Sequence, residues 1–84
     1  MKPVRMYTTP ICPYCVRAKS LFRKKGVDIE EVDVLMDVDA REEMKTKSGG
    51  ARSVPQIFIG DTHVGGCDEL YALEKEGKLD PLLA

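Results

Sequence analysis

The sequence lacks long apolar runs, internal repeats and a dense set of cysteines, and each absence excludes a class of protein. No stretch approaches the roughly 18 apolar residues of a transmembrane helix, so no membrane-spanning segment is expected. Residues 1–7 carry charge and lack the apolar segment of a signal peptide, which predicts a cytoplasmic location. Three cysteines, an odd number, do not suit the disulfide framework of a small secreted protein.

The composition suits one globular domain. The chain has 84 residues, 43% of them hydrophobic, so residues 1–84 are expected to form a single domain and a monomer. The net charge is only −1, yet residues 1–27 hold seven Lys or Arg and no acid. That basic half is either a solvated helix face or a field that favours a thiolate and an anionic substrate. Because the patch is short and holds no interleaved aromatic residues, nucleic-acid binding is not predicted.

Residue periodicity predicts two β-α units in the first half. Residues 4–8 alternate as a strand does, and Pro13 favours the first position of a helix that Gly26 ends. The apolar stripe expected along this helix comprises Tyr14, Cys15, Ala18, Leu21 and Phe22. A second strand is expected over residues 29–34, followed by a helix that Asp37 or Asp39 caps and that runs to about residue 47.

The second half predicts a hairpin and a helix. Residues 56–59 form an apolar strand, a two-residue turn follows at 60–61, and residues 62–64 return. Two glycines at 65–66 break this strand before a helix at about 68–76, and a short helical turn opens at Asp80-Pro81. The order β-α-β-α-β-β-α predicts an α/β fold with one small mixed sheet of four strands flanked by helices.

The stretch Cys12-Pro13-Tyr14-Cys15 carries the expected chemistry. Cys12 falls just before the first helical residue, where free N–H groups and the helix dipole favour its reactive thiolate form. Cys15 lies one turn further in and shares the inward stripe, so it should be more buried and less acidic. This is the arrangement expected of an attacking and a resolving cysteine.

Two other uses of the cysteines compete with a redox pair. A structural disulfide is disfavoured because a four-residue loop removes little chain entropy and the cytoplasm reduces it. A zinc site is conceivable, with Cys12, Cys15, Cys67 and His63 as ligands. Small zinc modules usually hold their ligands in two short turns, whereas two β-α units intervene here, and His63 suits a solvated strand face. The catalytic redox pair is therefore favoured.

Three motifs in order, C-P-Y-C at 12–15, S-V-P-Q-I-F-I at 53–59 and G-G-C-D at 65–68, make the whole chain resemble the glutaredoxin family. The similarity is to its short bacterial dithiol type. The resemblance implies a thioredoxin-like fold and glutathione-dependent reduction of disulfides. It also implies a cis peptide bond before Pro55, although residues alone would favour trans.

The resemblance further implies a glutathione site. The backbone of Val54 would pair with the extended tripeptide, as in strand addition, and Tyr14 would line the wall of the groove. Gly66, Cys67 and Asp68 would present N–H groups at a helix start to the γ-glutamyl carboxylate, and the Asp68 carboxylate would meet the adjacent ammonium group. Residues alone leave other roles open: Asp68 as the helix N-cap, and Cys67 as a core-filling thiol.

One position departs clearly from the family pattern. Family members commonly carry Lys or Arg three residues before the first cysteine, where this chain has Thr9. Thr9 is still expected to belong to the glutathione site. Arg41 or Arg52 is expected to reach the glycyl carboxylate in place of the missing basic residue. The change at Thr9 is expected to weaken glutathione binding or thiolate formation, whereas Ser53 and Glu69 are milder departures.

The predicted function is a glutathione-disulfide oxidoreductase that reduces glutathione mixed disulfides and protein disulfides through Cys12 and Cys15. Glutathione is the expected co-substrate, and no metal or organic prosthetic group is expected. Expected partners are glutathionylated or disulfide-containing proteins, with ribonucleotide reductase a family-level candidate. Alternatives are a redoxin coupled to thioredoxin reductase, which Thr9 favours, and a module that binds zinc or an iron–sulfur cluster.

Overall fold

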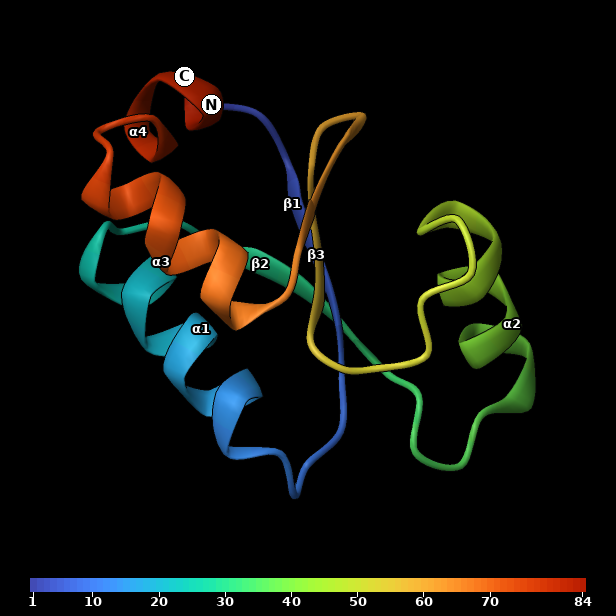
Figure 1. Cartoon of the computed structure of the whole chain (residues 1–84). Coiled ribbons are helices and arrows are strands. Elements are labelled where there is room, and N and C mark those ends of the chain that lie inside the picture. The colour runs from blue at the N-terminus through green and yellow to red at the C-terminus, as the bar shows by residue number, and fades with distance from the viewer.

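Four strands and four helices follow the punctuation of the sequence by glycine and proline. The computed structural model describes residues 1–84 (Figure 1). Its elements are β1 (Val4–Thr8), α1 (Pro13–Lys24), β2 (Ile29–Asp33), α2 (Val38–Lys47), β3 (Gln56–Ile59), β4 (Thr62–Gly65), α3 (Cys67–Lys75) and α4 (Leu79–Leu83). The predicted α/β order is confirmed, with α4 as a separate short helix at its end. No helix is long and apolar enough to cross a membrane.

The topology of the sheet brings four connecting segments to one end of the strands. Its strand order is β2-β1-β3-β4, with β1 and β2 parallel and the other two pairs antiparallel. The last residues of β1, β2 and β4 therefore lie at the end of the sheet where β3 begins. This end is at the bottom of Figure 1, and the two termini lie at the opposite end. Loop 9–12, connection 34–37, the residues before Pro55 and the start of α3 are consequently neighbours.

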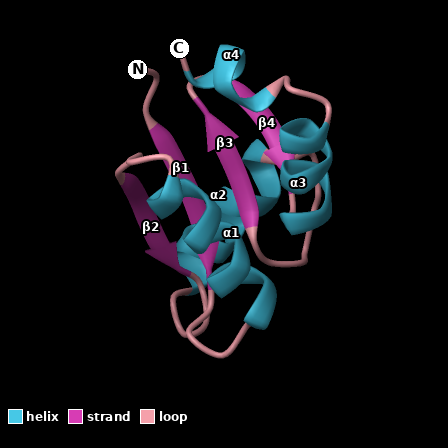
Figure 2. Ribbon diagram, turned by 90° about the vertical axis from the view of Figure 1, so that its left-hand side faces the viewer, coloured by secondary structure: helices cyan, strands magenta, loops and turns pink.

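Two apolar clusters attach helices to the two faces of the sheet. The larger lies under α1, α3 and α4, and its buried members include Met6, Phe22, Ile57 and Leu70. The smaller lies under α2 and consists of Tyr7, Val34, Ala40, Met44 and Phe58. Figure 2, turned by 90° from Figure 1, shows the strands with helices before and behind them. The mixed sheet flanked by helices is thus as predicted.

Helix α1 begins and ends where the sequence predicts. Pro13 occupies its start, and Gly26 follows its end with a φ of 71°, a conformation that glycine adopts without strain. Four residues of the expected stripe are buried, but Tyr14 is 53% exposed. The prediction that Tyr14 packs in the stripe is wrong, because on that side the first turn faces a surface groove and not a strand.

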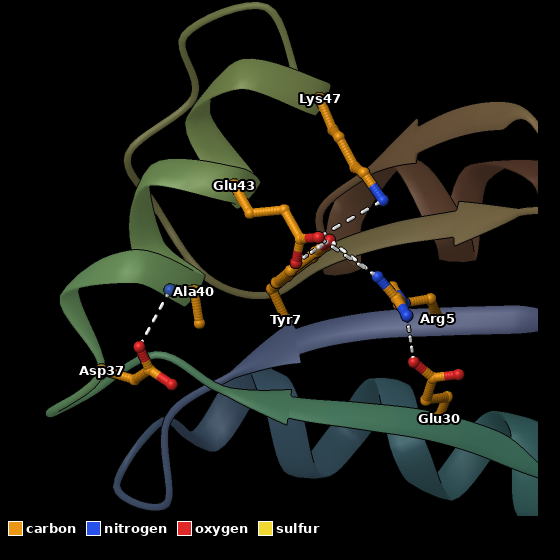
Figure 3. Close-up of polar contacts among 7 residues, drawn as sticks. All are labelled: Arg5, Tyr7, Glu30, Asp37, Ala40, Glu43 and Lys47. Carbon is orange, nitrogen blue, oxygen red and sulfur yellow. Dashed lines mark hydrogen bonds and ion pairs between the residues drawn. The ribbon is translucent and has the colours of Figure 1, made fainter.

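Polar contacts supplement the small apolar contact area of α2 (Figure 3). The Asp37 carboxylate accepts the Ala40 N–H at 3.0 Å, so Asp37 and not Asp39 is the N-cap. Further along the helix, Glu43 accepts the Tyr7 hydroxyl at 3.0 Å. The same carboxylate group of Glu43 lies 3.6 Å from Arg5 Nη1.

The start of α3 differs by one or two residues from the prediction. Gly65 is the last residue of β4, and Gly66 is the N-cap of a helix that begins at Cys67. The alternative in which Asp68 caps this helix is therefore wrong. The reason is that Glu69, three residues after the N-cap, accepts the Gly66 N–H at 2.6 Å.

Candidate active site

Cys12 is the N-cap of α1, as predicted, and it is partly exposed. Its backbone N–H donates to the Thr9 carbonyl at 3.4 Å, which fixes loop 9–12 as a tight turn after β1. Its Sγ lies 3.7 Å from the carbonyl oxygen of Val54. The thiol therefore sits between the first turn of α1 and the residues that precede β3.

Cys15 is fully buried one turn further along α1. Burial raises the pKa of the Cys15 thiol to about 11, and contact with Cys12 acts in the same direction. A backbone N–H···S interaction at Thr9 and the positive charge of Lys19 oppose this rise in the pKa. The expectation that Cys15 is buried and a weak acid is confirmed. All three cysteines are free thiols.

A polar network near Cys15 was not predicted from the sequence. Lys19 Nζ donates to Glu31 Oε2 at 3.0 Å, and the buried Thr8 hydroxyl donates to the same oxygen at 2.7 Å. These bonds, with the Thr8 contribution the larger, hold the pKa of Glu31 below its usual value. Lys19 follows Cys15 by four residues, a spacing that places both on one helix face. That spacing was the available signal.

A groove runs from Tyr14 across the start of β3 to the start of α3. Its volume is about 180 Å³. The eight lining residues are Tyr14, Ser53, Val54, Pro55, Gly66, Cys67, Asp68 and Glu69. Six of these were predicted site residues. Ser53 and Glu69 had been noted only as departures from a family pattern. The peptide bond between Val54 and Pro55 is cis, as the resemblance implied.

Space is limited where α3 meets Pro55. A Cβ built on Gly66 would lie 3.4 Å from the Pro55 carbonyl oxygen and 3.2 Å from Glu69 Oε1. Gly66 thus permits close contact between the two sides of the groove. Because the Gly66 N–H is already bound by Glu69, the N–H groups that remain for a ligand at this helix start are those of Cys67, Asp68 and Glu69.

Three predicted residues do not line the groove. Thr9 is buried in loop 9–12 and acts there through its backbone. Arg41 belongs to α2, on the other face of the sheet, and Arg52 is likewise not a lining residue. Cys67 lines the groove but is itself buried, and burial raises the pKa of its thiol.

The predicted alternative of a zinc site places His63 with the cysteines, which the structure does not do. His63 Nε2 lies 2.7 Å from Gln56 Oε1, and its ring stacks on Phe58 at a centroid distance of 4.8 Å. No three side chains among His, Cys, Asp and Glu are arranged to hold a metal ion.

The geometry suits exchange between a thiol and a disulfide. A partly exposed thiol stands at a helix N-terminus, a buried thiol lies one turn further along, and the groove that Val54 lines opens beside Cys12. Such exchange needs an attacking thiolate, a second thiol as leaving or resolving group and access for the substrate.

Comparisons with known proteins agree with this geometry. A family model described as glutaredoxin matches residues 4–64. A glutaredoxin from Pseudomonas aeruginosa is 55% identical over 84 residues, which cover all of this chain and 99% of the relative. The solution structure of a glutaredoxin from Brucella melitensis is 55% identical, with a TM-score of 0.84 over 99% of this chain and 89% of that one. A buckwheat glutaredoxin–glutathione complex is 34% identical, with a TM-score of 0.85 over 98% and 76% of the two chains.

Proposed function

This chain belongs to the glutaredoxin family of thiol-disulfide oxidoreductases, and we propose that it reduces glutathione mixed disulfides and protein disulfides with glutathione as co-substrate. Cys12 is the nucleophile and Cys15 the resolving cysteine. The observation that carries this proposal is the asymmetry of the pair. Cys12 is partly exposed at the N-terminus of α1, whereas Cys15 is fully buried with a pKa of about 11.

For a glutathionylated protein, the Cys12 thiolate attacks the glutathione sulfur. A disulfide forms between Cys12 and glutathione, the bond to the substrate sulfur breaks, and the substrate thiolate leaves and takes up a proton. A second glutathione thiolate then attacks the adduct and releases glutathione disulfide and the Cys12 thiolate. One free glutathione is consumed, because the other half of the glutathione disulfide comes from the mixed disulfide itself, and Cys15 takes no part.

For a protein disulfide, both cysteines act. Cys12 attacks one substrate sulfur and forms a mixed disulfide. Cys15, as the thiolate, then attacks Cys12 Sγ, which releases the reduced substrate and leaves a Cys12–Cys15 disulfide. Two glutathione molecules return the pair to dithiols. Burial, which raises the pKa of the Cys15 thiol, disfavours the thiolate form that this step needs.

We assign the groove beside Cys12 to glutathione. The backbone of Val54 pairs with the tripeptide, and Tyr14 forms the side wall. The N–H groups of Cys67 and Asp68 bind the γ-glutamyl carboxylate at the start of α3, and the Asp68 carboxylate binds the adjacent ammonium group. The buckwheat relative forms a complex with glutathione, which supports this assignment.

Thr9 and Arg41 have different places in this proposal. The Thr9 carbonyl accepts the Cys12 N–H and positions the nucleophile, so Thr9 acts through its backbone and not by a charge. Arg41 lies on α2 and does not line the groove, and it is proposed to reach the glycyl carboxylate of glutathione from outside the groove.

The test is the reduction of a glutathionylated peptide by glutathione, with glutathione reductase as the reporter. We expect Cys12→Ser to abolish turnover and Cys15→Ser to retain it, because the route from a mixed disulfide needs one cysteine. With a protein disulfide as substrate, both variants should lose activity.

Two results would contradict the proposal. One is wild-type protein that is inactive with glutathione and accepts electrons from thioredoxin reductase, which would identify a redoxin of another type. The other is stoichiometric metal, or visible absorbance of a cluster, in freshly purified protein, which would identify a metal-binding module that uses the same thiols.

A further inference from the structure

The exposed apolar side chains are concentrated at the end of the sheet where Cys12 lies. Seven large apolar side chains are exposed, and six of them belong to segments 11–16 and 35–38. They are Ile11, Tyr14, Val16, Leu35, Met36 and Val38. Exposed apolar groups gathered at one place on a small protein usually mark an interaction site.

Segment 35–38 is next to the loop of the nucleophile. The Val34 N–H donates to the Thr8 carbonyl at 2.9 Å, so the connection from β2 to α2 starts beside the connection from β1 to Cys12. In the strand order β2-β1-β3-β4, loop 9–12 therefore has segment 35–38 on one side and the groove at Pro55 on the other. Both connections lie at the bottom of Figure 1.

Carboxylates surround the exposed apolar groups of this segment. A hollow is lined by Asp33, Met36, Asp37, Val38 and Asp39, and we call it the β2–α2 surface. None of its three carboxylates forms a salt bridge. Residues 33–41 contain three Asp and one Arg, a net charge of −2. Met36 is 88% and Val38 72% exposed, which leaves both free to contact a partner.

We propose that the β2–α2 surface binds the polypeptide part of a mixed-disulfide substrate, and that the segment it selects combines apolar with basic residues. This inference rests on the proposed function, because it supposes that glutathione occupies the groove on the other side of Cys12. The apolar contacts come from Met36 and Val38. The charge complementarity comes from the three carboxylates without a basic partner, which disfavour an acidic segment.

The contact acts during a single exchange step. With its glutathione part in the groove, the mixed disulfide presents its glutathione sulfur to Cys12. The Cys12 thiolate forms a bond to that sulfur, the bond to the peptide sulfur breaks, and the peptide thiolate departs and is protonated by solvent. Residues that flank the peptide cysteine lie on the β2–α2 surface until departure, so they affect binding before the chemical step.

The experiment compares three glutathione mixed disulfides: a peptide with Leu and Lys beside the cysteine, the same peptide with Glu for Lys, and mercaptoethanol. We expect kcat/KM to be roughly three- to tenfold higher for the Lys peptide than for the Glu peptide, given the modest strength of exposed charge pairs. The double variant Met36→Gln/Asp39→Asn should remove most of that preference through KM and leave mercaptoethanol turnover unchanged. Asp61→Asn, an exposed acid at the hairpin tip at the opposite end of the sheet, is the matched control.

Equal kcat/KM for the two peptides would overturn the inference, as would an unchanged preference in the double variant or the same loss of preference in Asp61→Asn. These outcomes are separable from failure of the proposed function. Wild-type protein that does not turn over the mercaptoethanol mixed disulfide would contradict the glutathione route itself.

Discussion

Lys19, whose positive charge acts on the Cys15 thiol, is paired with Glu31. Lys19 lowers the pKa of the Cys15 thiol, while the main effect, burial, raises it. Glu31 holds the Lys19 ammonium at 3.0 Å and is itself held by the Thr8 hydroxyl. Because the carboxylate partly neutralises the ammonium, removing either partner should change the field at Cys15, and the two changes should differ in sign.

We therefore expect Lys19→Met to raise and Glu31→Gln to lower the pKa of Cys15, with Lys19→Arg close to wild type. The measurement is thiolate absorbance against pH in a background where Cys12 is serine and Cys67 alanine. Partly exposed charges contribute about 0.2–1 kcal/mol, roughly a 1.4- to fivefold change in the acidity of Cys15 and in the rate at which it resolves a mixed disulfide. Turnover of glutathionylated peptides, which needs only Cys12, should change little.

The two variants distinguish an electrostatic from a structural role. If both substitutions moved the titration in the same direction, loss of packing between α1 and β2 would explain the result, and the role of the charge would be refuted.

At the scale of elements, α2 is the helix whose N-cap side chain accepts a backbone hydrogen bond. It buries only Ala40 and Met44, and its N-terminus is closed by the Asp37 carboxylate. Replacing Asp37 by alanine should lower the free energy of unfolding by about 1 kcal/mol, the usual contribution of an N-cap. Asp37→Asn should restore most of it because an amide oxygen caps almost as well. Urea unfolding followed by circular dichroism measures both.

The neighbouring acid provides the control for this prediction. Asp39 is exposed and accepts no capping bond, so Asp39→Ala should cost only a few tenths of a kcal/mol through the helix dipole. If Asp39→Ala lowered the free energy of unfolding as much as Asp37→Ala, the assignment of the N-cap to Asp37 would be wrong.

The elements were predictable where local signals agree. Pro13 and Gly26 delimit α1, and the two-residue turn at Gly60-Asp61 sets the hairpin, because these residues restrict or extend backbone freedom locally. The start of α3 was misplaced because Asp68 is a good capping residue, whereas the actual bond joins Glu69 to the Gly66 N–H. Both patterns are consistent with local preference, and the bond from the Gly66 N–H to the Glu69 carboxylate shows which of them the fold uses.

At the scale of the whole molecule, the topology of the sheet assembles the candidate site from segments far apart in sequence. The resemblance of three motifs indicated that residues 12–15, 54–55 and 66–68 meet, and they do line one groove or its edge. The network of Thr8, Lys19 and Glu31 was not predictable, since its bonds join residues 12 and 23 positions apart on three elements. The contact of Arg41 with the glycyl carboxylate stays a prediction, because Arg41 belongs to α2 and does not line the groove.

The burial of Cys15 should make the free energy of unfolding of the protein depend on pH. The pKa of the Cys15 thiol rises from 9.0 in the unfolded chain to about 11 in the folded protein. The folded state therefore retains a proton that the unfolded state loses at lower pH. This contribution is fully present below pH 9 and is lost as pH rises through the folded pKa near 11. Two pKa units correspond to roughly 3 kcal/mol at most.

We expect the free energy of unfolding of the reduced protein to fall between pH 9 and pH 11, and to fall less in Cys15→Ala. Lysines and tyrosines also titrate in this range, so the informative quantity is the difference in slope between wild type and variant. Cys67→Ala serves as the second comparison, because burial also raises the pKa of that thiol. Equal slopes for wild type and Cys15→Ala would mean that Cys15 ionises as readily in the folded protein as in the unfolded chain. The interpretation that burial keeps the resolving thiol of Cys15 protonated would then be wrong.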